Sequence, residues 1–174
     1  SQLLFRPAEI ADSPSITELV NAAYRGETSR QGWTTEADLL EGLRTTPAEV
    51  QRLIETPDTL ILTGVRHDEI VASVCLEYDA EAVHIGMFTV HPALQGVGIG
   101  KQLLTYAENY AQKSWKLQKF LMHVISVRHE LIAFYLRRGY RRTGMMRPFP
   151  VNPAMWQPKM TGLQLELLEK AAPV

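Results

Sequence analysis

The sequence lacks the features that mark several large classes of protein. Its single cysteine, Cys75, excludes an internal disulfide and a zinc site built from several cysteines. No uninterrupted apolar run approaches the roughly 20 residues that a membrane-spanning helix needs. Charged residues from Arg6 onward interrupt the apolar start of the chain, where a secretory signal would lie. We therefore expect a protein of the reducing cytoplasm that has no membrane partner.

An excess of charge of one sign is also absent, since 18 lysines and arginines stand against 19 aspartates and glutamates. The net charge of -1 gives no overall positive field, so we do not expect nucleic acid as a partner. Hydrophobic residues at 45% and charged residues at 21% are typical of a globular protein rather than a disordered one. A chain of 174 residues fits one domain, and we predict a single domain over residues 1–174.

The spacing of apolar, capping and turn residues predicts an α+β domain with a mixed sheet. Ser13-Pro14 and Thr46-Pro47 each place a capping residue before a proline at the first position of a helix. Three β-rich runs separated by short polar turns predict an antiparallel meander between residues 59 and 91. The predicted strands are 2–7, 59–66, 69–78, 82–91, 120–127, 140–146 and 163–167. The predicted helices are 14–24, 36–44, 47–55, 99–113 and 129–138, with a loop at 24–34 and a long irregular connection at 147–160.

A turn rich in glycine follows the third strand of the meander and carries the strongest chemical signal. Residues 95–101 read QGVGIGK, with three glycines at alternate positions directly before a helix. Glycines leave the backbone amides unobstructed, and the start of a helix is electropositive, so the turn is suited to binding a pyrophosphate. On the glycines alone, a connector that binds no ligand remains an open alternative.

Three phosphate-binding motifs compete for this turn. A P-loop would need glycine in place of Gln95 and a hydroxyl residue in place of Gln102, which disfavours a nucleotide hydrolase. A dinucleotide-binding fingerprint has a different glycine spacing and lies near the start of a βαβ unit. The pattern Q/R-x-x-G-x-G/A is met in full by Gln95, Gly98 and Gly100.

That third pattern resembles the GNAT superfamily, the acyl-CoA-dependent N-acyltransferases. The lead-in Thr89-Val90-His91-Pro92 is similar to that of the family, and so is the later segment AFYLRRGY at residues 133–140. The likeness is close over residues 58–145 and loose over 2–45. It implies a mixed, mostly antiparallel central sheet flanked by helices on both faces, and acetyl-CoA as the acyl donor.

The resemblance also implies where the donor binds. In the family, the strand before the glycine turn separates from its neighbour, and the pantetheine arm pairs with the freed backbone groups. Those groups would belong here to Phe88, Thr89 and Val90. The pyrophosphate would lie on the amides of Gln95, Gly96, Val97, Gly98, Ile99, Gly100 and Lys101. Backbone amides do the charge-balancing there, so no metal is expected.

Two proton transfers accompany the reaction that the resemblance implies. Tyr135 matches the tyrosine that serves the family as general acid, although a helix aromatic packed on the core is the alternative. His84 stands where some members carry a catalytic glutamate, and strict alternation would put His84, Gly86 and Phe88 on one face. Glu77 is a second candidate base and a chain of water molecules a third, while His84 has the alternative of a cross-strand hydrogen bond.

A covalent acyl-enzyme is not expected, because Cys75 lies within an apolar strand, where a thiol is usually inert. Direct attack by the amine in a ternary complex is the consistent route. One departure from the family is Arg128, which stands where an asparagine often helps to hold the cofactor. Arg128 would then approach a phosphate of CoA or lie at the surface.

The acceptor is less determined than the donor. The polar segment at 24–34 offers Tyr24, Arg25 and Trp33, which suit a small polar or amino-acid-like amine, unless they only form a surface loop. Five arginines, at 137, 138, 141, 142 and 147, would attract a phosphate or a carboxylated acceptor, unless they are simply solvated. The segment Pro148 to Pro158 would cover the acceptor cleft or contribute to a homodimer interface.

The sequence thus predicts an N-acetyltransferase that moves an acetyl group from acetyl-CoA to the primary amine of a small molecule. Two alternatives remain open. One is a domain that binds acyl-CoA as a regulatory ligand without catalysis, and the other is an N-acetyltransferase that acts on proteins.

Overall fold

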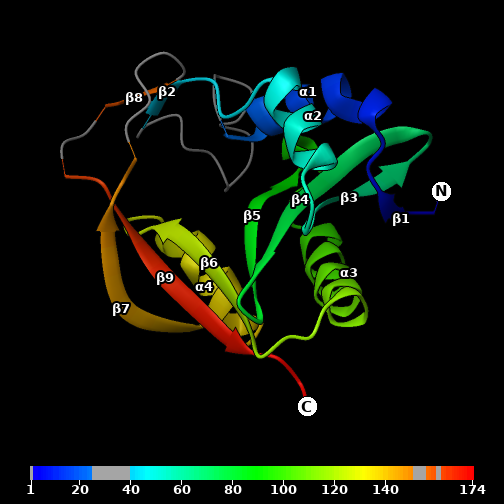
Figure 1. Cartoon of the computed structure of the whole chain (residues 1–174). Helices are drawn as coiled ribbons and strands as arrows, with labels where there is room; N and C mark the ends of the chain where they lie inside the picture. The colour runs from blue at the N-terminus through cyan, green and yellow to red at the C-terminus, as the bar shows by residue number, and fades with distance from the viewer. Residues whose placement is uncertain (1, 25–39, 151–155, 160–161) are drawn as a thin grey trace.

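The computed structural model describes residues 2–24, 40–150, 156–159 and 162–174. Its centre is a seven-stranded sheet in the order β1-β3-β4-β5-β6-β9-β7 (Figure 1). All neighbouring strands are antiparallel except β5 and β6, which are parallel. The strands of this sheet are β1 (Leu4–Pro7), β3 (Thr59–Arg66), β4 (Glu69–Asp79), β5 (Ala82–Val90), β6 (Lys119–Ile125), β7 (Arg141–Pro148) and β9 (Gln164–Ala171).

Helices cover both faces of the sheet, which confirms the predicted α+β class. On one face, α1 (Ser13–Tyr24) and α2 (Pro47–Glu55) form a core cluster with β3, β4 and β5. On the other face, α3 (Ile99–Ser114) and α4 (His129–Arg137) build a larger cluster around the fully buried Phe120. Two short 3-10 turns, Ile10–Asp12 and Pro92–Leu94, precede α1 and α3. No helix within the described ranges is long and apolar enough to cross a membrane.

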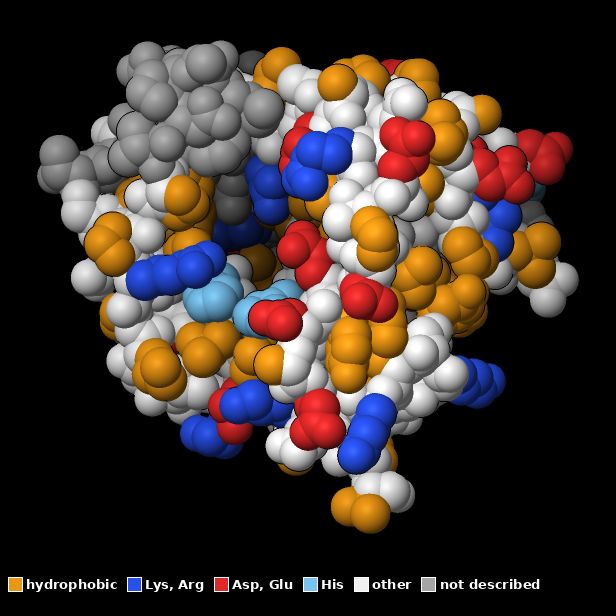
Figure 2. Space-filling model, viewed as in Figure 1, with side chains coloured by type: hydrophobic (Ala, Val, Ile, Leu, Met, Phe, Trp, Pro, Cys, Tyr) orange, Lys and Arg blue, Asp and Glu red, His pale blue; other side chains and the backbone are white. Residues whose placement is uncertain are grey.

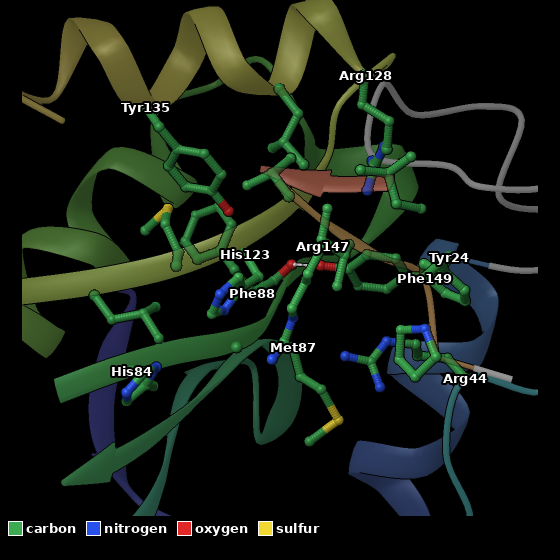
Figure 3. A pocket seen from close by; sticks show the side chains of 18 of the residues that line it. Tyr24, Arg44, His84, Met87, Phe88, His123, Arg128, Tyr135, Arg147 and Phe149 are labelled. Atoms are coloured by element: carbon green, nitrogen blue, oxygen red, sulfur yellow. Dashed lines mark hydrogen bonds between the residues drawn. The ribbon is translucent and has the colours of Figure 1, made fainter. Parts of the chain in front are cut away.

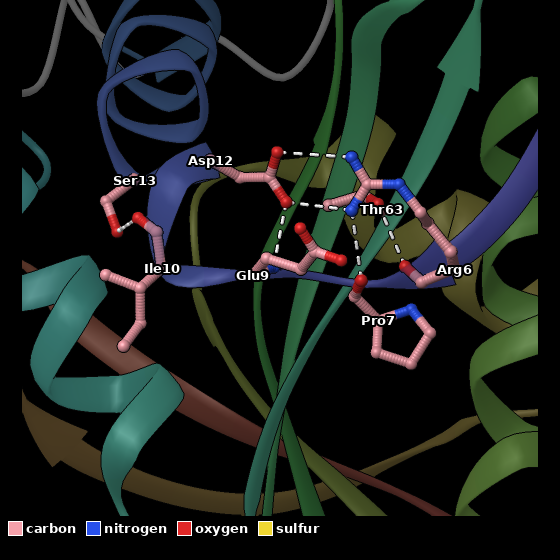
Figure 4. A network of polar contacts seen from close by, with 7 residues as sticks. All are labelled: Arg6, Pro7, Glu9, Ile10, Asp12, Ser13 and Thr63. Carbon is pink, nitrogen blue, oxygen red and sulfur yellow. Dashed lines mark hydrogen bonds and ion pairs between the residues drawn. The ribbon is translucent and has the colours of Figure 1, made fainter.

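Side-chain caps fix where the first helices begin. Before α1, the Asp12 carboxylate accepts hydrogen bonds from the Glu9 amide at 2.8 Å and from the Arg6 guanidinium at 2.8 and 3.1 Å (Figure 4). Its neighbour Ser13 donates to the Ile10 carbonyl at 2.7 Å. The guanidinium of Arg6 lowers the pKa of Asp12, so the carboxylate stays charged near neutral pH.

The start of α2 follows the sequence prediction closely. Thr46 accepts a hydrogen bond from the Glu49 amide at 3.2 Å, and Pro47 occupies the first position of the helix. Proline has no backbone N–H, and this costs no hydrogen bond at the first position, because the first amides of a helix have no partner within the helix. The strands of the predicted meander are also found, as β3, β4 and β5.

Two sequence predictions fail where a distant strand provides pairing. The predicted helix at 36–44 is wrong over Leu40–Gly42, which form the strand β2, while residues 36–39 lie outside the described part. Strand β2 pairs with β8 (Trp156–Pro158), which lies in the connection predicted to be irregular. Gly42 ends the strand at a φ of 104°, in the region that favours glycine. Local capping patterns cannot report this pairing because the partner lies more than a hundred residues away.

Candidate active site

A split between the parallel strands β5 and β6 forms the candidate site. The strands pair only from Ala82 to His84, opposite Lys119 to Leu121, and no further pair between them occurs among the described residues. Strand β5 nevertheless continues to Val90 by pairing with β4. Between the separated strands lies a pocket of about 390 Å³ (Figure 3). Figure 2 shows a hollow on this face of the molecule, with basic (Lys or Arg) and histidine side chains at its edge.

Tyr135 reaches this pocket from α4. Its ring packs edge-on against Phe88 at 5.8 Å between centroids, and its side chain is almost completely buried. The hydroxyl points into the pocket (Figure 3). Burial raises the pKa of Tyr135 well above its ordinary value of 10, so the phenol keeps its proton at neutral pH. A protonated hydroxyl that points into the pocket can donate a proton there, and the role of general acid stays a prediction.

The opposite wall carries the candidate bases. Glu77 on β4 and His84 on β5 are directly opposite each other in the antiparallel ladder, and both line the pocket. His123 on β6 lies parallel to His84, with 6.2 Å between ring centroids. Desolvation lowers the pKa of His123, and the charge of Arg147 and the nearby His84 lower it further. The imidazole of His123 is therefore largely neutral near pH 7, which is the form that accepts a proton.

Sequence reasoning missed His123. In the segment FLMHVI, alternation places His123 on the same face of the strand as Leu121. Leu121 pairs with His84 of β5, so the pairing of β6 with β5 brings His123 near His84. That signal exists only once the two strands are known to be neighbours.

A bulge changes which β5 residues face which side. The register between β4 and β5 shifts near Met87, whose φ is 46°. An extra residue in one strand reverses the alternation beyond it. Phe88 therefore packs on the α3 and α4 side, whereas Gly86 and His84 pair with β4 residues that face α1 and α2. The expectation that His84, Gly86 and Phe88 share one face is wrong for this reason.

Cys75 is not placed to act as a nucleophile. It is buried in the cluster under α1 and α2, with 3% of its surface exposed. Burial raises the pKa of its thiol to about 12, and the charge of Glu77 adds to the shift. The thiol is therefore protonated at neutral pH, as expected for a core cysteine.

The glycine turn lies at the carboxyl end of β5, directly before α3. Gln95 donates a hydrogen bond from Nε2 to the Val90 carbonyl at 2.9 Å, which ties the turn to the end of the strand. Gly96 and Gly98 have φ values of 88° and 90°, and both are exposed with no neighbour near a Cβ position. Gly98 is the N-cap of α3, so the exposed amides of the turn lie at the positive end of a helix.

Close packing joins this turn to the aromatic residues of the pocket. A Cβ at Gly100 would lie 3.3 Å from the Phe88 ring and 3.6 Å from the Phe134 ring. Ile99 is buried in the same core, while Val97 and Lys101 are exposed. The turn and Tyr135 therefore belong to one packed unit.

The part of β5 beyond His84, which does not pair with β6, is held by a hydrogen bond from α1. Thr89 is fully buried, and its hydroxyl donates to the Met87 carbonyl at 2.9 Å, while Val90 packs in the core. The Tyr24 hydroxyl donates a hydrogen bond to the Phe88 carbonyl (Figure 3). Tyr24, predicted to contact an acceptor, thus lines the pocket and also holds the strand that forms its wall.

Arginines give the pocket most of its charge. Arg44, Arg128 and Arg147 all line it. Arg128 is 9% exposed, which rules out the surface position left open by the sequence. Arg44 was missed because it lies between β2 and α2 without a motif of its own. Arg25 and Trp33, also predicted for the acceptor, lie outside the described residues.

The arginine cluster predicted near the end of α4 divides into different environments. Only Arg147 lines the pocket. Arg141 pairs with Glu169 at 2.9 Å and Arg142 with Glu166 at 2.5 Å, both on β9. Arg138 lies over the Phe134 ring at 5.2 Å. Within the described ranges, no group of three His, Cys, Asp or Glu side chains is arranged to hold a metal ion.

Comparison with known families agrees with this geometry. The pattern of the acetyltransferase (GNAT) family matches residues 15–140, from within α1 to just beyond α4. The chain belongs to the GNAT acetyltransferase family. No curated protein matches its sequence significantly.

Solved structures of GNAT enzymes share the fold at low sequence identity. An N-acetyltransferase from Staphylococcus aureus Mu50 has a TM-score of 0.73 at 14% identity, covering 99% of both chains. The ribosomal-protein-S18-alanine N-acetyltransferase from Escherichia coli has a TM-score of 0.73 at 11% identity, covering 99% of this chain and 96% of its own. The PaiA N-acetyltransferase from Thermoplasma acidophilum, solved with coenzyme A, has a TM-score of 0.67 at 16% identity, covering 98% and 99%.

Proposed function

We propose that this GNAT protein is an enzyme that transfers the acetyl group of acetyl-CoA to the primary amine of a small molecule. The observation that carries the proposal is the split between β5 and β6, with the Tyr135 hydroxyl inside it and the glycine turn at the end of β5. The pocket volume of about 390 Å³ is within the range of small-ligand sites, which favours a small acceptor.

The residues present fit coenzyme A. The exposed amides of the glycine turn, at the start of α3, supply donors and a positive dipole for a diphosphate without a metal. The edge of β5 that no longer pairs with β6 supplies backbone groups for an extended pantetheine chain. Bound there, acetyl-CoA supplies an acyl group already activated as a thioester.

Residues on opposite walls of the pocket carry out the two proton transfers. Glu77 and His84 are the predicted acceptors for the proton that the ammonium must lose before its nitrogen attacks, and His123 adjoins them. The amine then forms the amide bond as the carbon–sulfur bond breaks, in a single ternary complex. Tyr135 gives its proton to the departing thiolate, a role supported by the position of its hydroxyl, which points into the pocket.

The decisive experiment combines binding with turnover. Calorimetry with CoA should detect binding, and release of free CoA from acetyl-CoA should depend on an added primary amine. Binding without release for any amine of a broad panel would favour the acyl-CoA sensor. Release with peptides alone would favour the protein acetyltransferase. A stoichiometric acetyl adduct on Cys75, detected by mass spectrometry, would overturn direct attack.

A further inference from the structure

Three arginines enter the pocket from separate elements. Arg44 comes from the segment between β2 and α2, Arg128 from the start of α4, and Arg147 from β7 (Figure 3). Glu77 is the one carboxylate among the described residues that line the pocket. The described walls therefore carry more positive than negative charge, in a protein whose net charge is -1.

Two of these arginines are held in place by the same aromatic ring. The guanidinium carbons of Arg44 and Arg128 lie 5.8 and 5.7 Å from the centroid of the Tyr24 ring. The Tyr24 hydroxyl is bound in turn to the Phe88 carbonyl. The backbone of Arg44 is fixed as well, since its amide donates to Asn21 Oδ1 at 2.8 Å. Both guanidiniums are thus positioned by α1 before any ligand arrives.

Nothing in the described protein neutralises the charge of Arg44 or Arg147 by an ion pair. Arg44 is partly buried, and removing a charged group from water is unfavourable unless an opposite charge accompanies it, whereas Arg147 stays exposed to water. Guanidinium groups bind carboxylates with two parallel hydrogen bonds, so a carboxylate is the ligand that fits this arrangement.

We propose, on the basis of the proposed acetyltransferase activity, that the acceptor amine also carries a carboxylate, which binds among Arg44, Arg128 and Arg147. The amine end of the same molecule would lie toward Glu77 and His84, which face each other across the β4–β5 ladder. The acceptor is then a compound of the amino-acid type. A polyamine or a simple alkylamine would place no carboxylate among the three arginines and would add positive charge to the pocket, so we expect both to bind more weakly.

Paired ligands test this directly by calorimetry on the protein saturated with CoA. The probes are the protein amino acids and the ω-amino acids from β-alanine to 6-aminohexanoate, each beside its carboxamide. We expect the carboxylate of a binding pair to bind at least about tenfold more tightly than its carboxamide, which corresponds to about 1.4 kcal/mol. Equal affinities, or no binding by any carboxylate, would overturn the proposal.

Variants of the arginines test which of them bind the carboxylate. Arg147→Gln and Arg44→Gln should each bring the ratio of the two affinities toward one, and Arg147→Lys should retain part of it. Arg141→Gln is the matched control, because Arg141 is exposed on the same strand as Arg147 but outside the pocket. Arg147 is itself exposed, so its replacement leaves the core intact. A ratio that survives in both glutamine variants would place the carboxylate elsewhere.

Turnover on the same compounds separates this proposal from the proposed function. Tight binding of carboxylates without release of CoA would contradict the acetyltransferase while leaving the anion site intact. Efficient acetylation of alkylamines, with no preference for amino acids, would contradict the anion site while leaving the acetyltransferase intact.

Discussion

The Tyr24 hydroxyl donates a hydrogen bond to the Phe88 carbonyl, which joins the end of α1 to the part of β5 that has separated from β6. Both residues are buried, with 6% and 3% of their surfaces exposed. The contact matters because a strand without a neighbour on one side has backbone groups that need partners. Tyr24 satisfies one of them and at the same time positions two arginines through its ring.

Loss of this bond should destabilise the fold. Tyr24→Phe leaves the Phe88 carbonyl buried without this donor, and we expect the free energy of unfolding to fall by about 1–3 kcal/mol. Urea denaturation followed by fluorescence measures the change. Tyr78→Phe is the matched control, because the Tyr78 hydroxyl donates to the Lys116 carbonyl at an exposed site. Equal midpoints for the Tyr24 variant and the wild type would show that this hydrogen bond does not stabilise the fold.

Removing the hydroxyl of Tyr135 should slow the chemical step. Tyr135→Phe keeps the ring that packs on Phe88 and removes the proton donor, so we expect turnover to fall by about 100-fold or more. Affinity for CoA, measured by calorimetry, should stay near the wild-type value. Tyr110→Phe, on α3 and outside the pocket, controls for the loss of a phenol. Unchanged turnover would remove Tyr135 from the role of general acid.

A side chain at the start of α3 should weaken CoA binding. Gly98→Ala forces alanine into a backbone conformation with φ of 90°, which costs about 1–2 kcal/mol for a residue with a Cβ. The turn should relax and move its amides, so the dissociation constant for CoA should rise by at least about tenfold. Gln102→Ala, an exposed change in the first turn of the same helix, is the control and should bind CoA as the wild type does. Unaltered affinity in the glycine variant would contradict binding by these amides.

Stability should depend on the protonation of His123. Its pKa in the folded protein is below the ordinary 6.5, so the unfolded chain binds the proton more readily. The wild type should therefore lose stability as the pH falls below about 6.5, until the lower folded pKa is reached. His123→Gln should show a smaller loss across the same window, as measured by urea midpoints between pH 5 and 8. Identical pH profiles for the two proteins would contradict the shift, and His129→Gln, an exposed histidine, controls for losing an imidazole.

Much of the fold could be predicted because its signals are local. Thr46 and Pro47 define the start of α2, and polar turns delimit the meander, whatever surrounds them. The failures arose where the decisive interaction was distant. Leu40 to Gly42 form a strand because β8 pairs with them, and Phe88 changes face because of a bulge against β4. No pattern within either segment contains that information.

The sequence by itself determined where the glycine turn lies, because Gln95, Gly98 and Gly100 specify a backbone conformation at a helix start within a few consecutive residues. Tyr135 was marked only by the family resemblance of its segment, and its role stays a prediction. Only the tertiary structure decided which distant residues surround the pocket. His123, Arg44 and Arg147 meet in one pocket because β5 and β6 stop pairing after His84 and because β2 and β7 lie nearby in space but not in sequence. The physical reason is that local interactions fix backbone conformation, whereas the meeting of distant charges depends on strand order and on where two strands separate.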